Sequence, residues 1–134
     1  MNIVLDANAV IAYLNDETGG DVVDAILLDE SNLCYMHSIN ACEVYYDFVR
    51  RADSVTACAA IDSMIAAGVV IIEDMDAEIW KRAGEYKADL RRISLADCFC
   101  AALANRLEAE MLTADHSELD IVKERGLCKV RFIR

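Results

Sequence analysis

Short apolar runs alternate along this chain with longer segments of helical character, and this alternation restricts the fold more than any other feature. The expected strands are residues 2–5, 33–37, 69–72, 110–113 and 129–133. The expected helices are residues 7–14, 21–29, 38–51, 54–67, 76–90, 94–107 and 117–125. Strands that are separated by helices form a parallel sheet with helices on both faces. The sequence therefore predicts an α/β fold with a central parallel sheet of about five strands.

The size and composition fit one compact acidic domain. The 134 residues suit a single domain over residues 1–134 and leave little room for a second. Hydrophobic residues make up 56% of the chain, although its formal net charge is −11. Disorder needs low hydrophobicity, so we expect a real core instead.

Membrane insertion and structural zinc are both disfavoured. The longest apolar run, Met64–Ile72, has nine residues, and a bilayer needs about 20. The N-terminus has no basic segment of the kind that begins a secretory signal, so we expect a cytoplasmic protein. The six cysteines lie among apolar neighbours and are interpreted as small apolar residues. The spacing of Cys98 and Cys100 is not that of a zinc site.

The helix that reaches Arg51 shows the spacing of a buried stripe. Ser38 or Asn40 is the expected cap of this helix. Apolar side chains then recur at the i, i+3, i+4, i+7 spacing of one helix face, at Ile39, Cys42, Tyr45, Tyr46 and Val49. We expect this face to be buried.

Four acidic residues lie where an α/β fold places its ligands. Asp6 directly follows the first expected strand, and Asp115 follows the fourth. Glu43 and Asp97 lie in the first turns of two largely apolar helices. Ligands bind beyond the carboxyl ends of parallel strands, and helix N-termini lie at the same edge. We therefore expect the four carboxylates to converge.

Each acid also has a purely structural interpretation. Asp6 can cap the helix that it precedes, and Asp115 can be a turn residue. The pairs that fit a capping box are Ser94 with Asp97, and Asn40 with Glu43. For any one acid taken alone, the sequence leaves both interpretations open.

Taken together, the four acids predict a metal site. Two carboxylates about 4 Å apart repel by about 4 kcal/mol at an effective dielectric constant of about 20. No Lys or Arg stands beside any of the four, so protons or metal cations must compensate their charge. Oxygen ligands in an incomplete cage suit one or two Mg²⁺ or Mn²⁺ ions, which activate water for attack on a phosphodiester.

The basic residues are confined to the second part of the chain. Residues 1–49 contain nine Asp and Glu and no Lys or Arg. A nucleic-acid binder usually has a net basic footprint, so an anionic substrate would need bound cations or a local basic stripe. The candidates for that stripe are Arg50, Arg51, Lys81, Arg82, Lys87, Arg91 and Arg92. The alternative is that these residues form a solvated helix surface.

Four short motifs follow one another along essentially the whole chain. They are Val4–Val10, Asn40–Val44, Ile93–Phe99 and Leu112–His116. In this order they resemble the motifs of PIN-domain ribonucleases, and most of all those of the toxin subunit of VapBC-type toxin–antitoxin pairs. The resemblance implies a PIN-like fold and a divalent-metal-dependent endoribonuclease. It also implies the catalytic and metal-binding acids, which are Asp6, Glu43, Asp97 and Asp115.

The resemblance further implies supporting residues and partners. Asn8, Ser94 and Thr113 match positions whose polar side chains orient the acids or the attacking water. An additional outer ligand could come from Glu118 or Asp120, and the sequence does not choose between them. Members of the family are usually dimers that an antitoxin neutralises by covering the site. We therefore expect an RNA substrate, an antitoxin partner and a homodimer.

The expected contacts with RNA involve four residues of the second part of the chain. They are Arg50, Arg91, Arg92 and His116. For His116, which follows the acid of the fourth motif, a role as general base competes with the interpretation as an exposed loop residue.

Two other functions remain open at this point. Phosphatases of the haloacid-dehalogenase type use an Asp nucleophile after a strand, as Asp6 is placed, but carry a second Asp two residues later where this chain has Asn8. A non-catalytic acidic binding module, with the four acids as caps and turns, is the second alternative.

Overall fold

In the computed structural model, which describes residues 1–134, five parallel strands form one sheet. The strands are β1 (Asn2–Leu5), β2 (Leu33–His37), β3 (Val69–Ile72), β4 (Glu110–Thr113) and β5 (Lys129–Phe132). Their order in the sheet is β3-β2-β1-β4-β5, so β1 is central and pairs with β2 and β4. The predicted α/β fold with a central parallel sheet is confirmed, and every strand lies within one residue of its expected range.

Seven helices connect or follow these strands. They are α1 (Ala7–Leu14), α2 (Gly20–Leu28), α3 (Ser38–Arg51), α4 (Ser54–Ala66), α5 (Ala77–Leu90), α6 (Leu95–Arg106) and α7 (His116–Glu124). Aspartate side chains accept a hydrogen bond from the first turn of four of these helices, and these caps are Asp6, Asp53, Asp76 and Asp115. A carboxylate suits this position because it pairs with an N–H group that has no partner within the helix.

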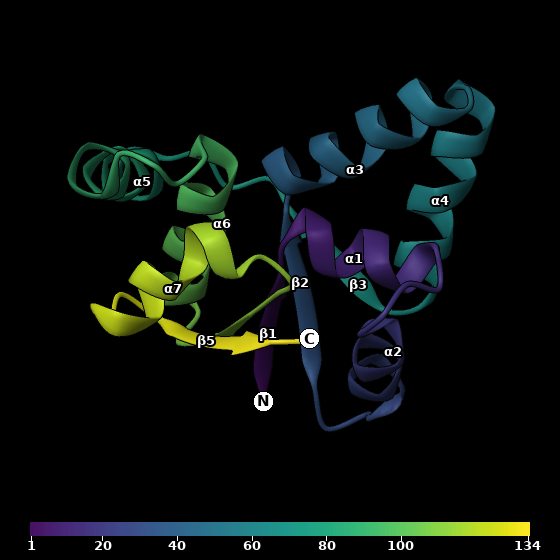
Figure 1. The fold of residues 1–134 in the computed structure, drawn as a ribbon, viewed down its shortest axis with the longest axis horizontal. Coiled ribbons are helices and arrows are strands. Elements are labelled where there is room, and N and C mark those ends of the chain that lie inside the picture. The colour runs from purple at the N-terminus through teal and green to yellow at the C-terminus, as the bar shows by residue number, and fades with distance from the viewer.

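The helices cover both faces of the sheet, as the sequence predicts (Figure 1). Side chains alternate between the faces of a strand. Accordingly, Ile3 and Leu5 of β1 pack in a core with α1, α2, α3 and α4. Val4 faces the opposite way and packs in a second core with α5, α6 and α7. The carboxyl end of β1 is therefore enclosed between two layers of helices.

The start of α3 differs from the expectation. His37, the last residue of β2, is its N-cap, and its ring Nδ1 accepts a hydrogen bond from the N–H of Ile39 at 3.1 Å. Asn40 already lies inside the helix, so the predicted capping box of Asn40 and Glu43 is wrong. The buried histidine takes the capping role because its ring, like a capping carboxylate, offers an acceptor to the first turn.

The predicted buried stripe of α3 is also wrong for most of its members. The buried residues of this helix are Asn40, Ala41, Val44 and Asp47. Tyr46 is 50% exposed, and Cys42, Tyr45 and Val49 are exposed as well. The face of α3 that contacts α4, α1 and α6 therefore includes two polar residues, Asn40 and Asp47.

No helix has both the length and the apolar character that crossing a membrane requires. All six cysteines are free, and three of them, Cys34, Cys98 and Cys100, are buried as small core residues. Cys42 and Cys58 are exposed, which differs from the expectation for these two.

Candidate metal centre

Asp6 lies between β1 and α1 and is completely buried. Its Oδ1 accepts a hydrogen bond from the N–H of Ala9 at 2.8 Å, so the interpretation of Asp6 as a helix cap is confirmed. Its Oδ2 accepts a hydrogen bond from the hydroxyl of Thr113 at the end of the neighbouring strand β4. Capping therefore occupies only one of the two carboxylate oxygens.

Thr113 links Asp6 to the second acid that follows a strand. Its Oγ1 accepts a hydrogen bond from the N–H of Asp115 at 3.0 Å while donating to Asp6. Asp115 in turn caps α7, because its Oδ1 accepts from the N–H of Glu118 at 3.2 Å and from the hydroxyl of Ser117 at 2.6 Å. The ends of β1 and β4 are thus connected through one hydroxyl group.

Asp97 lies in the first turn of α6, where Ser94 is the helix cap. The Oγ of Ser94 accepts from the N–H of Asp97 at 3.2 Å, as the sequence predicts. The N–H of Ser94, however, donates to Oε2 of Glu118 at 3.3 Å and not to Asp97. The capping-box interpretation is therefore wrong for the carboxylate of Asp97.

Three acids come within the distance of shared ligands. Asp97, Asp115 and Glu118 each offer one oxygen, and these oxygens lie within 4.8 Å of one another. Asp6 and Glu43 are outside this group of three, but the charge of Asp6 raises the pKa of Asp97. The charges of Asp115 and Glu43 both act on Asp6, and the charge of Glu118 acts on Glu43. Of the four predicted acids, Asp97 and Asp115 thus belong to the group of three, and the charges of Asp6 and Glu43 act within the same region.

Burial governs the protonation of these acids. It raises the pKa of Asp6 to about 7, against the lowering effect of the bonds from Thr113 and Ala9. Burial also raises the pKa of Asp97 well above its ordinary value, and the contact with Glu118 raises it further. The pKa of Glu43 is raised by burial and by the charge of Glu118. The ordinary charged form of each acid is therefore unfavourable without a compensating cation.

No Lys or Arg side chain forms an ion pair with any of these acids. All eight ion pairs of the protein involve other carboxylates. Asn40, whose side chain is fully buried, lacks one hydrogen-bond partner. Its Nδ2 donates to the carbonyl oxygen of Ala96 at 3.1 Å. Its Oδ1 has no partner, although buried polar atoms nearly always have one. The residues therefore fit a hydrated cation, whose oxygen preference matches this set of side chains.

The other polar residues expected at the site are placed unequally. Ser94 and Thr113 contact the acids as described, whereas Asn8 is exposed on the first turn of α1. Arg50 is exposed on α3, and its guanidinium is 2.8 Å from Asp47. Arg91 and Arg92 are exposed in the turn just before Ser94 and form no ion pair.

His116 is the first residue of α7, so its predicted position in a loop is wrong. Its ring stacks on Phe132, with the ring centres 3.7 Å apart. Nδ1 is 3.1 Å from Oδ1 of Asp120, and Nε2 is 2.9 Å from the carbonyl oxygen of Arg134. These two acceptors raise the pKa of His116 and engage both ring nitrogens within the C-terminal part of the chain.

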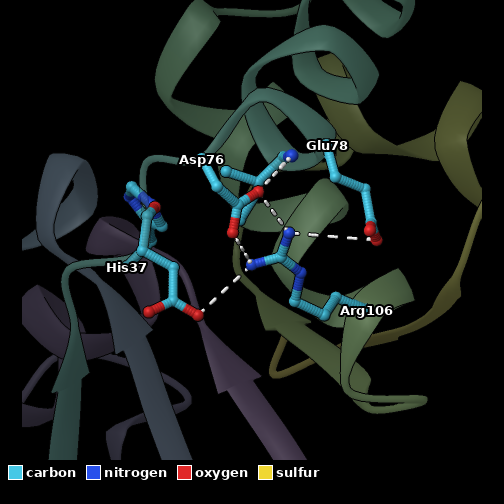
Figure 2. A network of polar contacts seen from close by, with 6 residues as sticks. His37, Asp76, Glu78 and Arg106 are labelled. Atoms are coloured by element: carbon cyan, nitrogen blue, oxygen red, sulfur yellow. Dashed lines mark hydrogen bonds and ion pairs between the residues drawn. The ribbon is translucent and has the colours of Figure 1, made fainter.

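A second group of acids surrounds Arg106, which sequence reasoning did not identify (Figure 2). The guanidinium is 2.6 Å from Asp76, 3.2 Å from Asp74 and 3.8 Å from Glu78. His37 contacts the same segment, since its Nε2 donates to the carbonyl oxygen of Asp74 at 2.8 Å. The ion pairs that reveal this group join residues 28 to 32 positions apart, so no local sequence pattern predicts it.

Comparison with known proteins identifies a family. The sequence profile of the PIN domain matches residues 3–124. Among curated proteins, none matches the chain by sequence.

Similar solved structures include VapBC2 of Rickettsia felis bound to a promoter DNA fragment, with 19% identity, a TM-score of 0.78 and 98% of each chain covered. DNA-bound VapBC of Salmonella typhimurium has 16% identity and a TM-score of 0.74, covering 100% of this chain and 99% of the other. VapC20 of Mycobacterium tuberculosis, a toxin that cleaves the sarcin-ricin loop, has 17% identity and a TM-score of 0.70, covering 89% of this chain and 94% of the other. These likenesses establish a common fold.

Proposed function

The chain belongs to the PIN domain family, and from that premise we propose that it is a divalent-metal-dependent endoribonuclease, the toxin of a toxin–antitoxin pair. One observation carries the proposal, namely the meeting of buried carboxylates without a basic partner at the carboxyl edge of the sheet. This is the edge at which open α/β sheets bind their ligands. A hydrated divalent cation compensates the negative charge of these carboxylates. Such cations commonly catalyse the hydrolysis of phosphodiesters.

The catalytic and metal-binding residues of this proposal are Asp6, Glu43, Asp97 and Asp115, with one or two Mg²⁺ or Mn²⁺ ions. A bound cation of this kind lowers the pKa of a water molecule and neutralises charge on the phosphate. Asp97 and Asp115 hold the cation, since their oxygens are in ligand range of each other. Thr113 fixes Asp6 against Asp115 through its hydroxyl. Asn8, Ser94 and Thr113 retain their proposed supporting role.

The geometry of Asp6 disfavours the phosphatase alternative. A nucleophilic aspartate needs an accessible oxygen, but Asp6 is 0% exposed. Both of its oxygens accept hydrogen bonds, from Ala9 and from Thr113. Asp6 is therefore poorly placed to attack a phosphate.

Arg91 and Arg92 are the best-placed basic residues for the RNA backbone. They are exposed, and they precede the cap of α6, whose first turn carries Asp97. Phosphate contacts of this kind position a nucleic acid without reading its sequence. Arg50 and His116 remain weaker candidates, because Asp47 engages the first and Asp120 with Arg134 engages the second.

We also propose an antitoxin partner and a homodimer. Several similar structures are complexes named VapBC, which supports a partner of the VapB kind. The exposed Tyr45, Tyr46 and Val49 on α3 offer apolar surface for protein contacts. The mass of the purified protein in solution tests the dimer, and a monomer at micromolar concentration contradicts it.

The central experiment measures cleavage of a labelled RNA with Mg²⁺ or Mn²⁺, with and without a chelator. We expect cleavage by the wild type that the chelator abolishes, and loss of cleavage in Asp97→Asn. Asp62→Asn is a matched control, because Asp62 is exposed on α4 and takes no part in the contacts of the acidic group. A folded Asp97→Asn protein that cleaves RNA at the wild-type rate would refute the proposal.

A further inference from the structure

The turn between α5 and α6 has a strained backbone. Arg91 has a φ of 53° and a ψ of −51°, and the N–H of Arg92 donates across it to the carbonyl oxygen of Leu90. This geometry is close to that of the γ-turn with positive φ, which is rare in proteins. Such a conformation persists only where the surrounding structure enforces it. The turn therefore needs a partner that holds it.

Lys87, one helical turn earlier on α5, is that partner. Its Nζ donates to the carbonyl oxygen of Arg91 at 2.8 Å and to that of Ile93 at 2.6 Å. Its own carbonyl oxygen accepts a hydrogen bond from the N–H of Arg91 at 3.0 Å. One lysine thus bonds both backbone groups of the strained residue and also a carbonyl group two residues further along the chain.

The usual interaction of a lysine with the end of its own helix does not account for this arrangement. A cation in the last turn is stabilised by the carbonyl groups of the helix C-terminus. However, α5 ends at Leu90, and both carbonyl groups that Lys87 binds lie beyond it. The ammonium group therefore connects α5 to the residue that precedes Ser94, the cap of α6.

The same turn carries the two arginines nearest to the start of α6. Arg91 and Arg92 are exposed, whereas the flanking Leu90 and Ile93 are 8% and 1% exposed and belong to the core. Because both ends of this two-residue segment are packed, its backbone conformation determines the direction of the two side chains. Neither guanidinium forms an ion pair, so both are free to bind an anion.

We propose that Lys87 is a positioning residue for RNA, which holds the turn in the form from which Arg91 and Arg92 contact the phosphate backbone and does not contact RNA itself. The inference rests on the proposed function, which supplies the RNA. It also separates the members of the basic stripe that the sequence predicts. The ammonium group of Lys87 is bonded within the protein, whereas the two guanidinium groups are not.

Proteolysis tests the hold on the turn without RNA. Lys87→Met keeps an unbranched side chain and removes the ammonium group, and Lys129→Met is a matched control at the exposed start of β5. An arginine-specific protease should cut Lys87→Met after Arg91 or Arg92 about 10-fold faster than the wild type, because cleavage follows the population of the open turn. Cleavage after Arg131, within β5, should not change, since it requires general unfolding.

RNA cleavage tests the positioning role. We expect Lys87→Met to raise the KM for a labelled RNA about 5-fold with kcat nearly unchanged, because the phosphate contacts are displaced but not removed. Lys87→Arg, which can still donate to both carbonyl groups, should restore part of the loss. In a protein that already carries Arg91→Ala and Arg92→Ala, Lys87→Met should raise the KM no further, because it acts through these two residues.

Equal rates of proteolysis after Arg91 and Arg92 in Lys87→Met and in the wild type overturn the inference. A further rise in KM when Lys87→Met is added to the double variant overturns it too, since the ammonium group would then contact RNA directly. A wild type that cleaves no RNA refutes the proposed function, while faster proteolysis of Lys87→Met still supports the hold on the turn. Metal-dependent cleavage by the wild type, together with unchanged proteolysis of Lys87→Met, refutes this inference alone.

Discussion

Acidic side chains gather at two places in this fold, and a basic side chain accompanies only one of them. Asp74, Asp76 and Glu78 lie near the surface around Arg106 (Figure 2). The hydrogen bond from Arg106 holds the pKa of Asp76 below its ordinary value. At the carboxyl edge of the sheet, burial instead raises the pKa of Asp6 and of Asp97.

The difference concerns where the compensating charge comes from. In the first group the protein supplies it from the last turn of α6. In the second group the acids stand at the other end of the same helix, where Asp97 lies, and the protein supplies none. Around Arg106 the guanidinium offsets part of the acidic charge and solvent screens the rest, because all three acids are more than half exposed. The unneutralised group is therefore the one that we propose as the metal centre, and the comparison is open to test.

The largest effect is expected from a substitution that places a positively charged side chain among the acids of the proposed metal centre. Glu43→Lys places an ammonium group near Glu118 and Asp6, as Arg106 stands near Asp76. We expect loss of Mn²⁺ uptake and a fall in RNA cleavage of about 1000-fold or more, because several kcal/mol of charge stabilisation depend on the metal. Glu78→Lys is the control in the other group. If Glu43→Lys cleaves RNA at a rate near that of the wild type, the acids at the carboxyl edge of the sheet do not depend on a bound metal ion, and the comparison fails.

The exposed arginines beside the centre should have a smaller effect on substrate binding. Arg91→Ala with Arg92→Ala should raise the KM for RNA about 10-fold, with kcat nearly unchanged, because phosphate contacts position the substrate. The salt dependence of RNA binding should weaken by about one unit of logarithmic slope for each lost contact. Arg125→Ala, on the far end of α7, serves as control. An unchanged salt dependence in the double variant counts against contact with RNA at this turn.

The stability of the metal-free protein should decrease with rising pH, because the pKa values of Asp6 and Asp97 are raised by burial and not lowered by a basic partner. The folded, metal-free protein keeps protons on Asp6 and Asp97 at pH values where the unfolded chain has released them. The free energy of unfolding should therefore fall as pH rises from about 4 through about 7 and beyond. Thermal melts in chelator between pH 5 and pH 9 measure it. Mn²⁺ should flatten the decline, and a midpoint that rises over this range would contradict the raised pKa values.

The smallest effect is expected at the group of acids around Arg106. Arg106→Met should lower the thermal midpoint by only a few degrees, because its acidic partners are more than half exposed. The loss should disappear near 1 M salt, where exposed charges are screened. Mn²⁺ affinity should stay at the wild-type value. Weakened Mn²⁺ binding in Arg106→Met would mean that the two groups are not independent.

The sequence predicted the fold closely because its signals are local. Apolar runs of four or five residues give the strands, and the acids after β1 and β4 follow from the topology of any parallel sheet. The meeting of Asp6 with Asp115 was thus foreseeable. The same reasoning failed on α3, because the pattern of apolar residues does not show that Asn40 and Asp47 are the buried ones.

The details of the centre depend on contacts between distant residues. Asp97 and Ser94 form half of a local capping box, and nothing in the local sequence shows that Glu118 completes it. Similarly, the sequence does not choose between Glu118 and Asp120, whereas the structure places Glu118 beside Asp97 and Asp115 and places Asp120 against His116. Long-range hydrogen bonds of this kind become visible only in three dimensions.

The single hydroxyl of Thr113 bears on which ion the proposed centre would select. It has one proton, which it donates to Asp6, and its lone pair holds the amide of Asp115, so the two acids are tethered at a fixed spacing. Ca²⁺ takes oxygen atoms at about 2.3–2.6 Å, and Mg²⁺ takes them at about 2.0–2.1 Å. A redesign of the proposed centre from one of these ions to the other would have to act on the spacing that Thr113 sets, which makes Thr113 its starting point.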